Sequence, residues 1–163
     1  MAIPASIERF LSDQHVPYTP VHHPPAYTAQ EEAAVTHTPG RAWAKTLVCL
    51  ADEVPILVVL SADRAVDEWR LRELTGATIV RLATEAEFAE LYPDSELGAM
   101  PPLGPMYAQR VYIDDALAKD SDIVFHAGTH TDAIRMRYDD FVSLVQPIRG
   151  RFSRKMVPRE YGA

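Results

Sequence analysis

The segment TLVCLADEVPILVVL, residues 46–60, decides the fold of this chain. Its two halves, TLVCLA (46–51) and PILVVL (55–60), are rich in β-branched residues and contain almost no polar side chains. Continuous apolar runs of this length are typical of strands that are buried on both faces. Three residues, Asp52, Glu53 and Val54, separate the halves, so we predict two core strands joined by a tight turn at Asp52-Glu53.

The segments on either side predict helices and shorter strands in irregular order. We expect helices over 4–14, 29–37, 66–75, 85–91 and 138–145, and strands over 77–83, 110–114 and 122–127. Capping boxes start two of the helices, Thr28 with Glu31 and Thr84 with Glu87. The four prolines of 16–27 allow at most a short edge strand there. This order favours an α/β (α+β) fold with a mixed sheet flanked by helices.

Composition limits the function classes. The chain has 163 residues, enough for one domain, and a net charge of −7 that argues against broad duplex binding. Cys49 has no partner for an internal disulfide, and the apolar run 54–60 is too short to span a bilayer. We therefore expect a cytoplasmic protein with no membrane or DNA partner. The basic residues of 149–159 form either a solvated tail or a phosphate contact.

Lys45 is the first candidate for chemistry. It stands in GRAWAKTLVCL, directly before the apolar run of the first core strand. A lysine in such a place is often only an apolar stem with its amine in water. Beside a pocket, the same ammonium can hold a phosphate or a carbonyl oxygen, or stabilise a developing oxyanion.

The second candidate is the loop GAMPPLGPMY, residues 98–107, which has two glycines, three prolines and no charge. Glycine lets a ligand approach the backbone closely, and proline restricts the backbone. The N–H groups of Gly98, Ala99 and Met100 could bind a carbonyl or an oxyanion. An ordered surface connection would have the same composition.

The third candidate is HAGTHTDAIRM, residues 126–136, where Gly128 interrupts a strand and polar residues follow. His126 and His130 are four residues apart, a spacing that suits a metal on a helix. A helix is not expected here, and the sequence indicates no further ligands. The pair His22-His23 is a weaker metal candidate, because adjacent side chains of an extended segment point to opposite faces.

Three segments in this order and spacing, AWAKTLVCL, GAMPPLG and HAGTHTDAIRM, resemble the YbaK/EbsC family. Its members are free-standing relatives of the editing domain inserted in bacterial prolyl-tRNA synthetase. The resemblance covers roughly 15–146, so we divide the chain into a YbaK-like domain, 1–146, and a basic C-terminal tail, 147–163. It implies a single domain with a mixed, partly closed sheet or barrel wrapped by helices. It also implies an aminoacyl-tRNA deacylase without metal or organic cofactor.

The resemblance also implies site residues. The family's lysine falls on Lys45, its G-x-x-x-P loop on 98–102, and its strand-end Gly-Thr or Gly-Ser on Gly128 and Thr129. Lys45 is therefore the expected catalytic residue. The expected substrate-binding residues are Tyr27, Thr28, Gly98, Ala99, Met100, Pro101, Pro102, Gly104, Gly128, Thr129 and His130. The expected partners are the acceptor end of an aminoacyl-tRNA and an aminoacyl-tRNA synthetase.

Two alternatives to hydrolysis of a small amino acid's ester stay open. The domain could be a binding module that recognises aminoacyl-tRNA, an amino acid or a partner protein without turnover, since fold does not determine function. It could also be a metal-dependent hydrolase that uses His126 and His130. The sequence does not name the amino acid, because one methylene changes the free energy of binding by only about 1–3 kcal/mol.

Overall fold

The expected hairpin is the centre of the fold. Strands β2 (Ala44–Ala51) and β3 (Val54–Ser61) pair antiparallel along their whole length. The structure is a computed structural model and describes residues 2–117, 119 and 121–157. Asp52 and Glu53 both have positive φ, 46° and 67°, as the twist-matched two-residue turn requires.

The two faces of β3 are buried in different clusters. Leu57 and Val59 point into the main core, which α1, α4, α5 and the three-stranded sheet also supply. Ile56, Val58 and Leu60 point into a second cluster beneath α3. Burial on both faces is thus confirmed, and it explains why the segment carries no polar alternation.

The strands form three sheets. The five-stranded sheet has the order β5 (Val80–Leu82), β2, β3, β6 (Arg110–Asp114), β9 (Ile148–Gly150). Its pairs are antiparallel from β5 to β3 and parallel from β3 to β9. The antiparallel three-stranded sheet has the order β1 (Thr19–His22), β8 (Asp132–Arg137), β7 (Asp122–Thr129). A separate ribbon pairs β4 (Arg64–Val66) with β10 (Ser153–Lys155).

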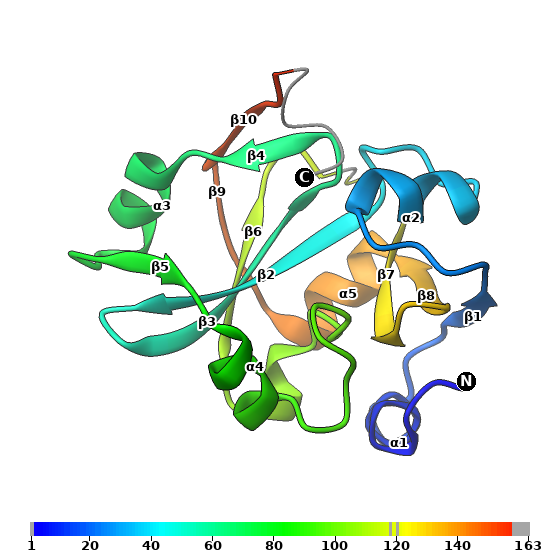
Figure 1. The fold of residues 1–163 in the computed structure, drawn as a ribbon. Helices are drawn as coiled ribbons and strands as arrows, with labels where there is room; N and C mark the ends of the chain where they lie inside the picture. The colour runs from blue at the N-terminus through cyan, green and yellow to red at the C-terminus, as the bar shows by residue number, and fades with distance from the viewer. Residues whose placement is uncertain (1, 118, 120, 158–163) are drawn as a thin grey trace.

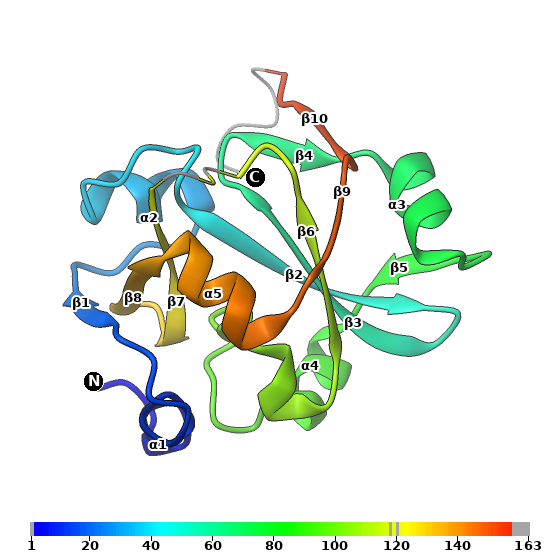
Figure 2. The same ribbon diagram turned by 180° about the vertical axis from the view of Figure 1, so that it is seen from behind.

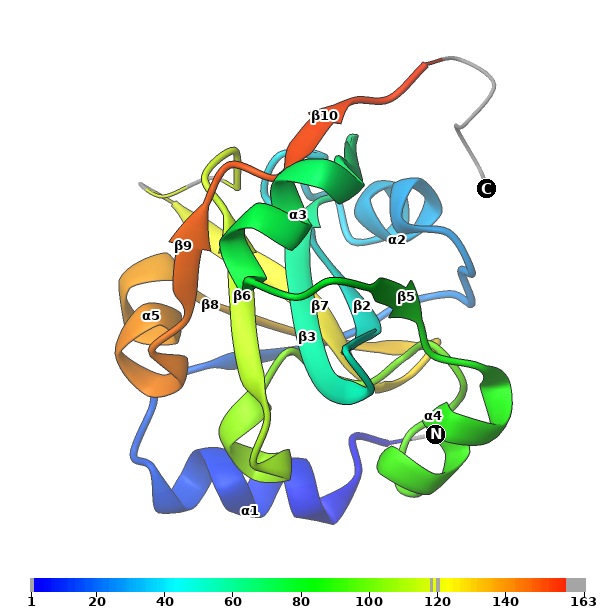
Figure 3. The same ribbon diagram turned by 90° about the vertical axis from the view of Figure 1, so that its left-hand side faces the viewer.

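Helices surround these sheets (Figure 1). They are α1 (Ala5–Asp13), α2 (Ala29–Val35), α3 (Glu68–Thr75), α4 (Glu85–Leu91) and α5 (Tyr138–Val145), with a 3-10 turn at Gly104–Tyr107. Helix α5 lies against the three-stranded sheet, where the rings of Phe141 and Phe125 are 5.8 Å apart (Figure 2). Helix α1 runs below the sheets (Figure 3). None of the described helices has the length and apolar character needed to cross a membrane.

The mixed α/β fold in one domain is confirmed, and in the described residues the sheets do not close into a barrel. All five expected helices are present, Thr84 with Glu87 as a complete capping box. Four strands were not predicted: β4, β8, β9 and β10. Three of them have only three residues, too few to show a periodic pattern. Two of these, β9 and β10, place residues 148–155 against the rest of the domain.

Candidate functional site

A pocket of about 160 Å³ opens beside Lys45. Four of the expected site residues line it: Tyr27, Thr28, Lys45 and Gly98. They come from the start of α2, the start of β2 and the proline-rich loop. The rest of the lining is Ala29, Trp43, Thr46 and His126. Four separate segments of the sequence therefore meet at one small concave surface.

Lys45 is held at the wall of this pocket. It is the second residue of β2, opposite Leu60, and its side chain is half-buried. Its Nζ donates a hydrogen bond of 2.5 Å to the carbonyl oxygen of Arg64, the first residue of β4. Arg64 is in turn fixed to β10, because its Nε donates to Ser153 Oγ at 2.6 Å. The ribbon of β4 and β10 thus positions the ammonium.

The proline-rich loop is anchored in the core. Ala99, Met100 and Leu103 are at most 1% exposed, and Pro101 and Pro102 are buried as well. The loop therefore packs these side chains into the core, and Gly98 lines the pocket. Gly98 has φ of 80° with open space at the Cβ position, so the backbone conformation is what favours glycine there.

The amide groups of the loop differ in their partners. Ala99 N–H donates to the Glu96 carbonyl at 2.9 Å, so it is already engaged. For the N–H groups of Gly98 and Met100, the described part of the chain offers no acceptor. Of these two residues only Gly98 lines the pocket. Its N–H is therefore the loop donor best placed for a ligand.

Three other expected residues, Gly104, Gly128 and Thr129, have structural contacts and do not line the pocket. At Gly104 a Cβ would collide with the Gln109 carbonyl. Gly128 has φ of 96° and lies against Pro4, and its N–H donates to the Ala99 carbonyl at 2.8 Å. The hydroxyl of Thr129 is buried and donates to Asp132 Oδ2 at 2.6 Å.

His130 lies beside the pocket, next to Tyr27 and His126. Its ring centroid is 4.9 Å from that of Tyr27, which is 72% exposed, and 5.7 Å from that of His126. Its Nε2 is 2.9 Å from the Leu97 carbonyl, and its backbone N–H donates to Glu96 Oε1 at 2.9 Å. The turn from β7 to β8 is thereby tied to the segment before Gly98.

Sequence reasoning missed an acidic residue behind the pocket. Glu32 of α2 is fully buried, with His23 Nε2 3.2 Å from Oε2 and His126 Nδ1 3.6 Å from Oε1. Burial, together with the charge of Glu31, raises the pKa of Glu32 to about 8. Burial, together with His130 and His23, lowers the pKa of His126 to about 3. Nothing in AQEEAAV distinguishes the buried Glu32 from its exposed neighbour Glu31.

The inner wall also carries polar atoms without hydrogen bonds. Trp43 Nε1, Thr46 Oγ1 and His126 Nδ1 are buried and have no partner within the described ranges. Native proteins rarely leave such groups unpaired, because each costs the free energy of its desolvation. All three residues line the pocket, so a ligand or water that enters it can satisfy them.

Comparison with known proteins agrees with this geometry. The family model of the aminoacyl-tRNA editing domain matches residues 23–144. A proline–tRNA ligase of Nitratidesulfovibrio vulgaris strain Hildenborough is 29% identical over 86% of the chain. Proline–tRNA ligase 1 of Anaeromyxobacter dehalogenans is 34% identical over 65% of it. The chain spans only 25% and 18% of the lengths of these two enzymes.

Solved structures show the same fold over almost the whole chain. One, described as a "putative trans-editing enzyme for prolyl tRNA synthetase", has a TM-score of 0.79 and 22% identity, covering 94% of this chain and 99% of its own. Another, described only as a hypothetical protein, has a TM-score of 0.81 and 20% identity, with coverage of 91% and 99%. The family match includes the residues of the pocket from Tyr27 to His126. The chain belongs to the aminoacyl-tRNA editing domain family.

Proposed function

We propose that the chain hydrolyses the ester of a mischarged aminoacyl-tRNA that carries a small amino acid. The observation that carries this proposal is that Lys45 and Gly98 line the same small pocket. A volume of about 160 Å³ is below the roughly 300–1,000 Å³ of pockets for drug-sized ligands, and it suits a small aminoacyl group.

In this proposal the acceptor end of the tRNA enters with its aminoacyl group in the pocket. Water attacks the ester carbonyl carbon, and the bond from that carbon to the ribose oxygen breaks. The ribose oxygen takes up the proton that the water loses. Gly98 N–H donates to the carbonyl oxygen as negative charge develops there. Lys45 holds the same oxygen or the terminal phosphate. An aminoacyl ester is already activated, so positioning and these charges suffice without a protein nucleophile.

The first test is deacylation of a panel of mischarged tRNAs, small amino acids first. Wild type should release one of these amino acids, and Lys45→Ala should lower that rate by about 10²–10³-fold, as loss of one oxyanion donor does. Lys119→Ala is the matched control, because Lys119 is exposed and pairs only with Asp115 at 3.4 Å. Thermal unfolding of each variant checks that its fold is intact.

Other outcomes would revise the proposal. Full activity of Lys45→Ala would remove that residue from the mechanism. If wild type binds an aminoacyl-tRNA saturably and releases no amino acid from the panel, the chain is a binding module. A synthetase partner, which would supply further tRNA contacts, can be sought by repeating the assay with prolyl-tRNA synthetase present.

A further inference from the structure

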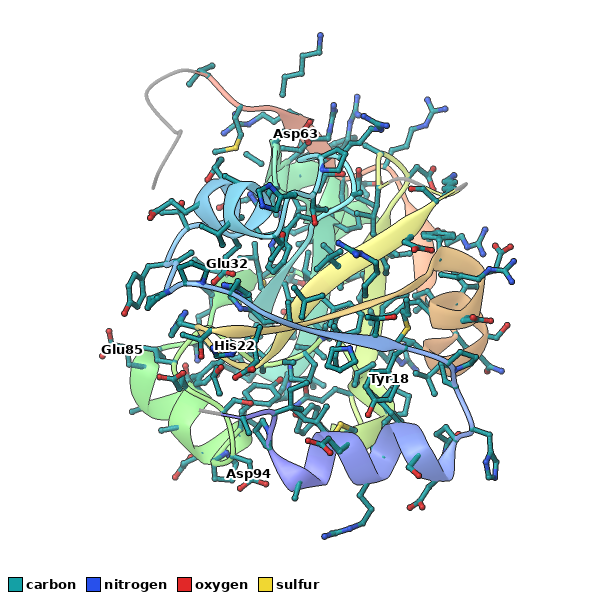
Figure 4. All side chains as sticks on the ribbon, turned by 90° about the vertical axis from the view of Figure 1, so that its right-hand side faces the viewer. Tyr18, His22, Glu32, Asp63, Glu85 and Asp94 are labelled. Carbon is teal, nitrogen blue, oxygen red and sulfur yellow. The ribbon has the colours of Figure 1, made fainter. Side chains whose placement is uncertain are left out.

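A cluster of metal-ligating side chains stands directly behind the pocket. Glu32 of α2, His126 of β7 and His130 of the β7–β8 turn each place one ligand atom within 4.8 Å of the others. Figure 4 shows Glu32 at the helix α2, with His22 of β1 labelled nearby. His126 belongs to both the cluster and the pocket lining.

Among the described residues, no hydrogen-bond donor stabilises a negative charge on the buried Glu32 carboxylate. Neither oxygen of Glu32 makes a hydrogen bond, although the side chain is fully buried. Its ion-pair contacts within the part of the chain that the structure describes are with His23 and His126. A buried carboxylate without a cation or hydrogen-bond donors is strongly disfavoured, so something must neutralise it.

The hydrogen bonds of His23 and His130 indicate which ring nitrogen of each carries the hydrogen. His23 Nδ1 lies 2.8 Å from the Pro24 carbonyl, and His130 Nε2 lies 2.9 Å from the Leu97 carbonyl. A carbonyl oxygen only accepts, so each of these nitrogens carries the hydrogen. The other nitrogens, His23 Nε2 and His130 Nδ1, then present lone pairs, and both are buried without a partner.

Unpartnered ring nitrogens of this kind are typical of a metal site without its ion, and not of a core whose polar groups are all hydrogen-bonded. A ligating histidine usually donates its second ring N–H to a carbonyl or carboxylate, which fixes the ring. His130 follows this pattern, since its Nε2 lies 2.9 Å from the Leu97 carbonyl.

We propose that Glu32, His126 and His130 bind a divalent transition-metal ion, Zn²⁺ by ligand type, beside the amino-acid pocket. Two imidazoles and one carboxylate form a ligand set that zinc accepts, with a fourth position left for water or substrate. Bond lengths of about 2.0–2.1 Å separate tetrahedral ligands by roughly 3.4 Å. Glu32 Oε1 and His126 Nδ1, 3.6 Å apart, already lie near this separation, and all ligand atoms of the cluster lie within 4.8 Å of one another.

Metal binding can be measured without ester hydrolysis, so it is tested on the protein alone. Chelator-treated full-length protein is titrated with Co²⁺, and the visible absorption of four-coordinate Co²⁺ is followed, with Zn²⁺ as competitor. Wild type should bind one equivalent. Glu32→Gln and His126→Asn should each weaken binding by more than about 100-fold, because the loss of a ligand costs more than the loss of an outer-shell partner.

The matched control is His37→Asn. His37 is exposed, lies just beyond α2 and has φ of 53°, a conformation that asparagine tolerates. It should bind Co²⁺ like wild type. The proposal fails if folded wild type binds neither Co²⁺ nor Zn²⁺, or if Glu32→Gln and His126→Asn both bind as tightly as wild type. In that case Glu32 is a buried neutral acid, and its proton is the neutralising charge.

Discussion

Two buried acids of this domain, Asp114 and Glu32, have opposite surroundings. Asp114, at the end of β6, is 2% exposed and accepts hydrogen bonds from Phe152 N–H at 2.8 Å, Ser153 Oγ at 2.7 Å and Ala116 N–H at 2.9 Å. Glu32 is fully buried and accepts none from the described residues. Both acids are buried, so burial does not distinguish them. The hydrogen bonds that each carboxylate accepts do distinguish them.

The largest effect should follow from Asp114→Ala. The substitution leaves the Phe152 amide and the Ser153 hydroxyl buried without an acceptor, so we expect the free energy of unfolding to fall by about 3 kcal/mol. Urea denaturation measures it, with the exposed Asp94→Ala as control. A loss no greater than that of the control would break the comparison, because Asp114 would then contribute no more than a surface acid.

Ser153→Ala should have an intermediate effect. It removes one of the three hydrogen bonds to Asp114 and the acceptor of Arg64 Nε, which lies 2.6 Å from Ser153 Oγ. We expect a loss of about 1–2 kcal/mol in the same denaturation experiment. Because Arg64 also holds Lys45, the variant should deacylate more slowly as well. Normal turnover would show that Lys45 keeps its position without this support.

Glu32→Gln should change stability least when no metal is present. No hydrogen bond is lost, and the tendency of the buried group to ionise disappears, so the free energy of unfolding should stay within about 1 kcal/mol of wild type or rise. Chelator-treated protein in the same experiment provides the measurement. A loss as large as that of Asp114→Ala would mean that Glu32 is a structural acid, and the contrast between the two would disappear.

The sequence predicts the parts of this molecule whose causes are local. The apolar run 46–60 predicts the central hairpin, and Thr84 with Glu87 predicts the start of α4. The strand β8, DAIRMR, was missed because its alternating arginines gave no continuous apolar run. No local pattern indicates the hydrogen bonds of Asp114 with Phe152 and Ser153, because these partners lie 38 and 39 residues away.

In the site, too, the sequence predicts residues in local motifs and misses those that only the packing of the chain brings together. Motif positions found Lys45 and Gly98, which line one pocket with Tyr27 and Thr28. The assignment of a catalytic role to Lys45 stays a prediction. Glu32 and His23 were out of reach, because their meeting with His126 depends on how α2 packs against the three-stranded sheet. No periodic pattern in a single segment records such a contact.

The ribbon of β4 and β10 also bears on the order of events during synthesis. It joins Arg64 to Ser153, 89 residues later, and Arg64 supplies the carbonyl that holds Lys45. The central hairpin can form long before that, since its contacts are local. On the ribosome, the lysine is therefore seated only after residues 153–155 have emerged, so a nascent chain has its core strands before it has a fully positioned ammonium.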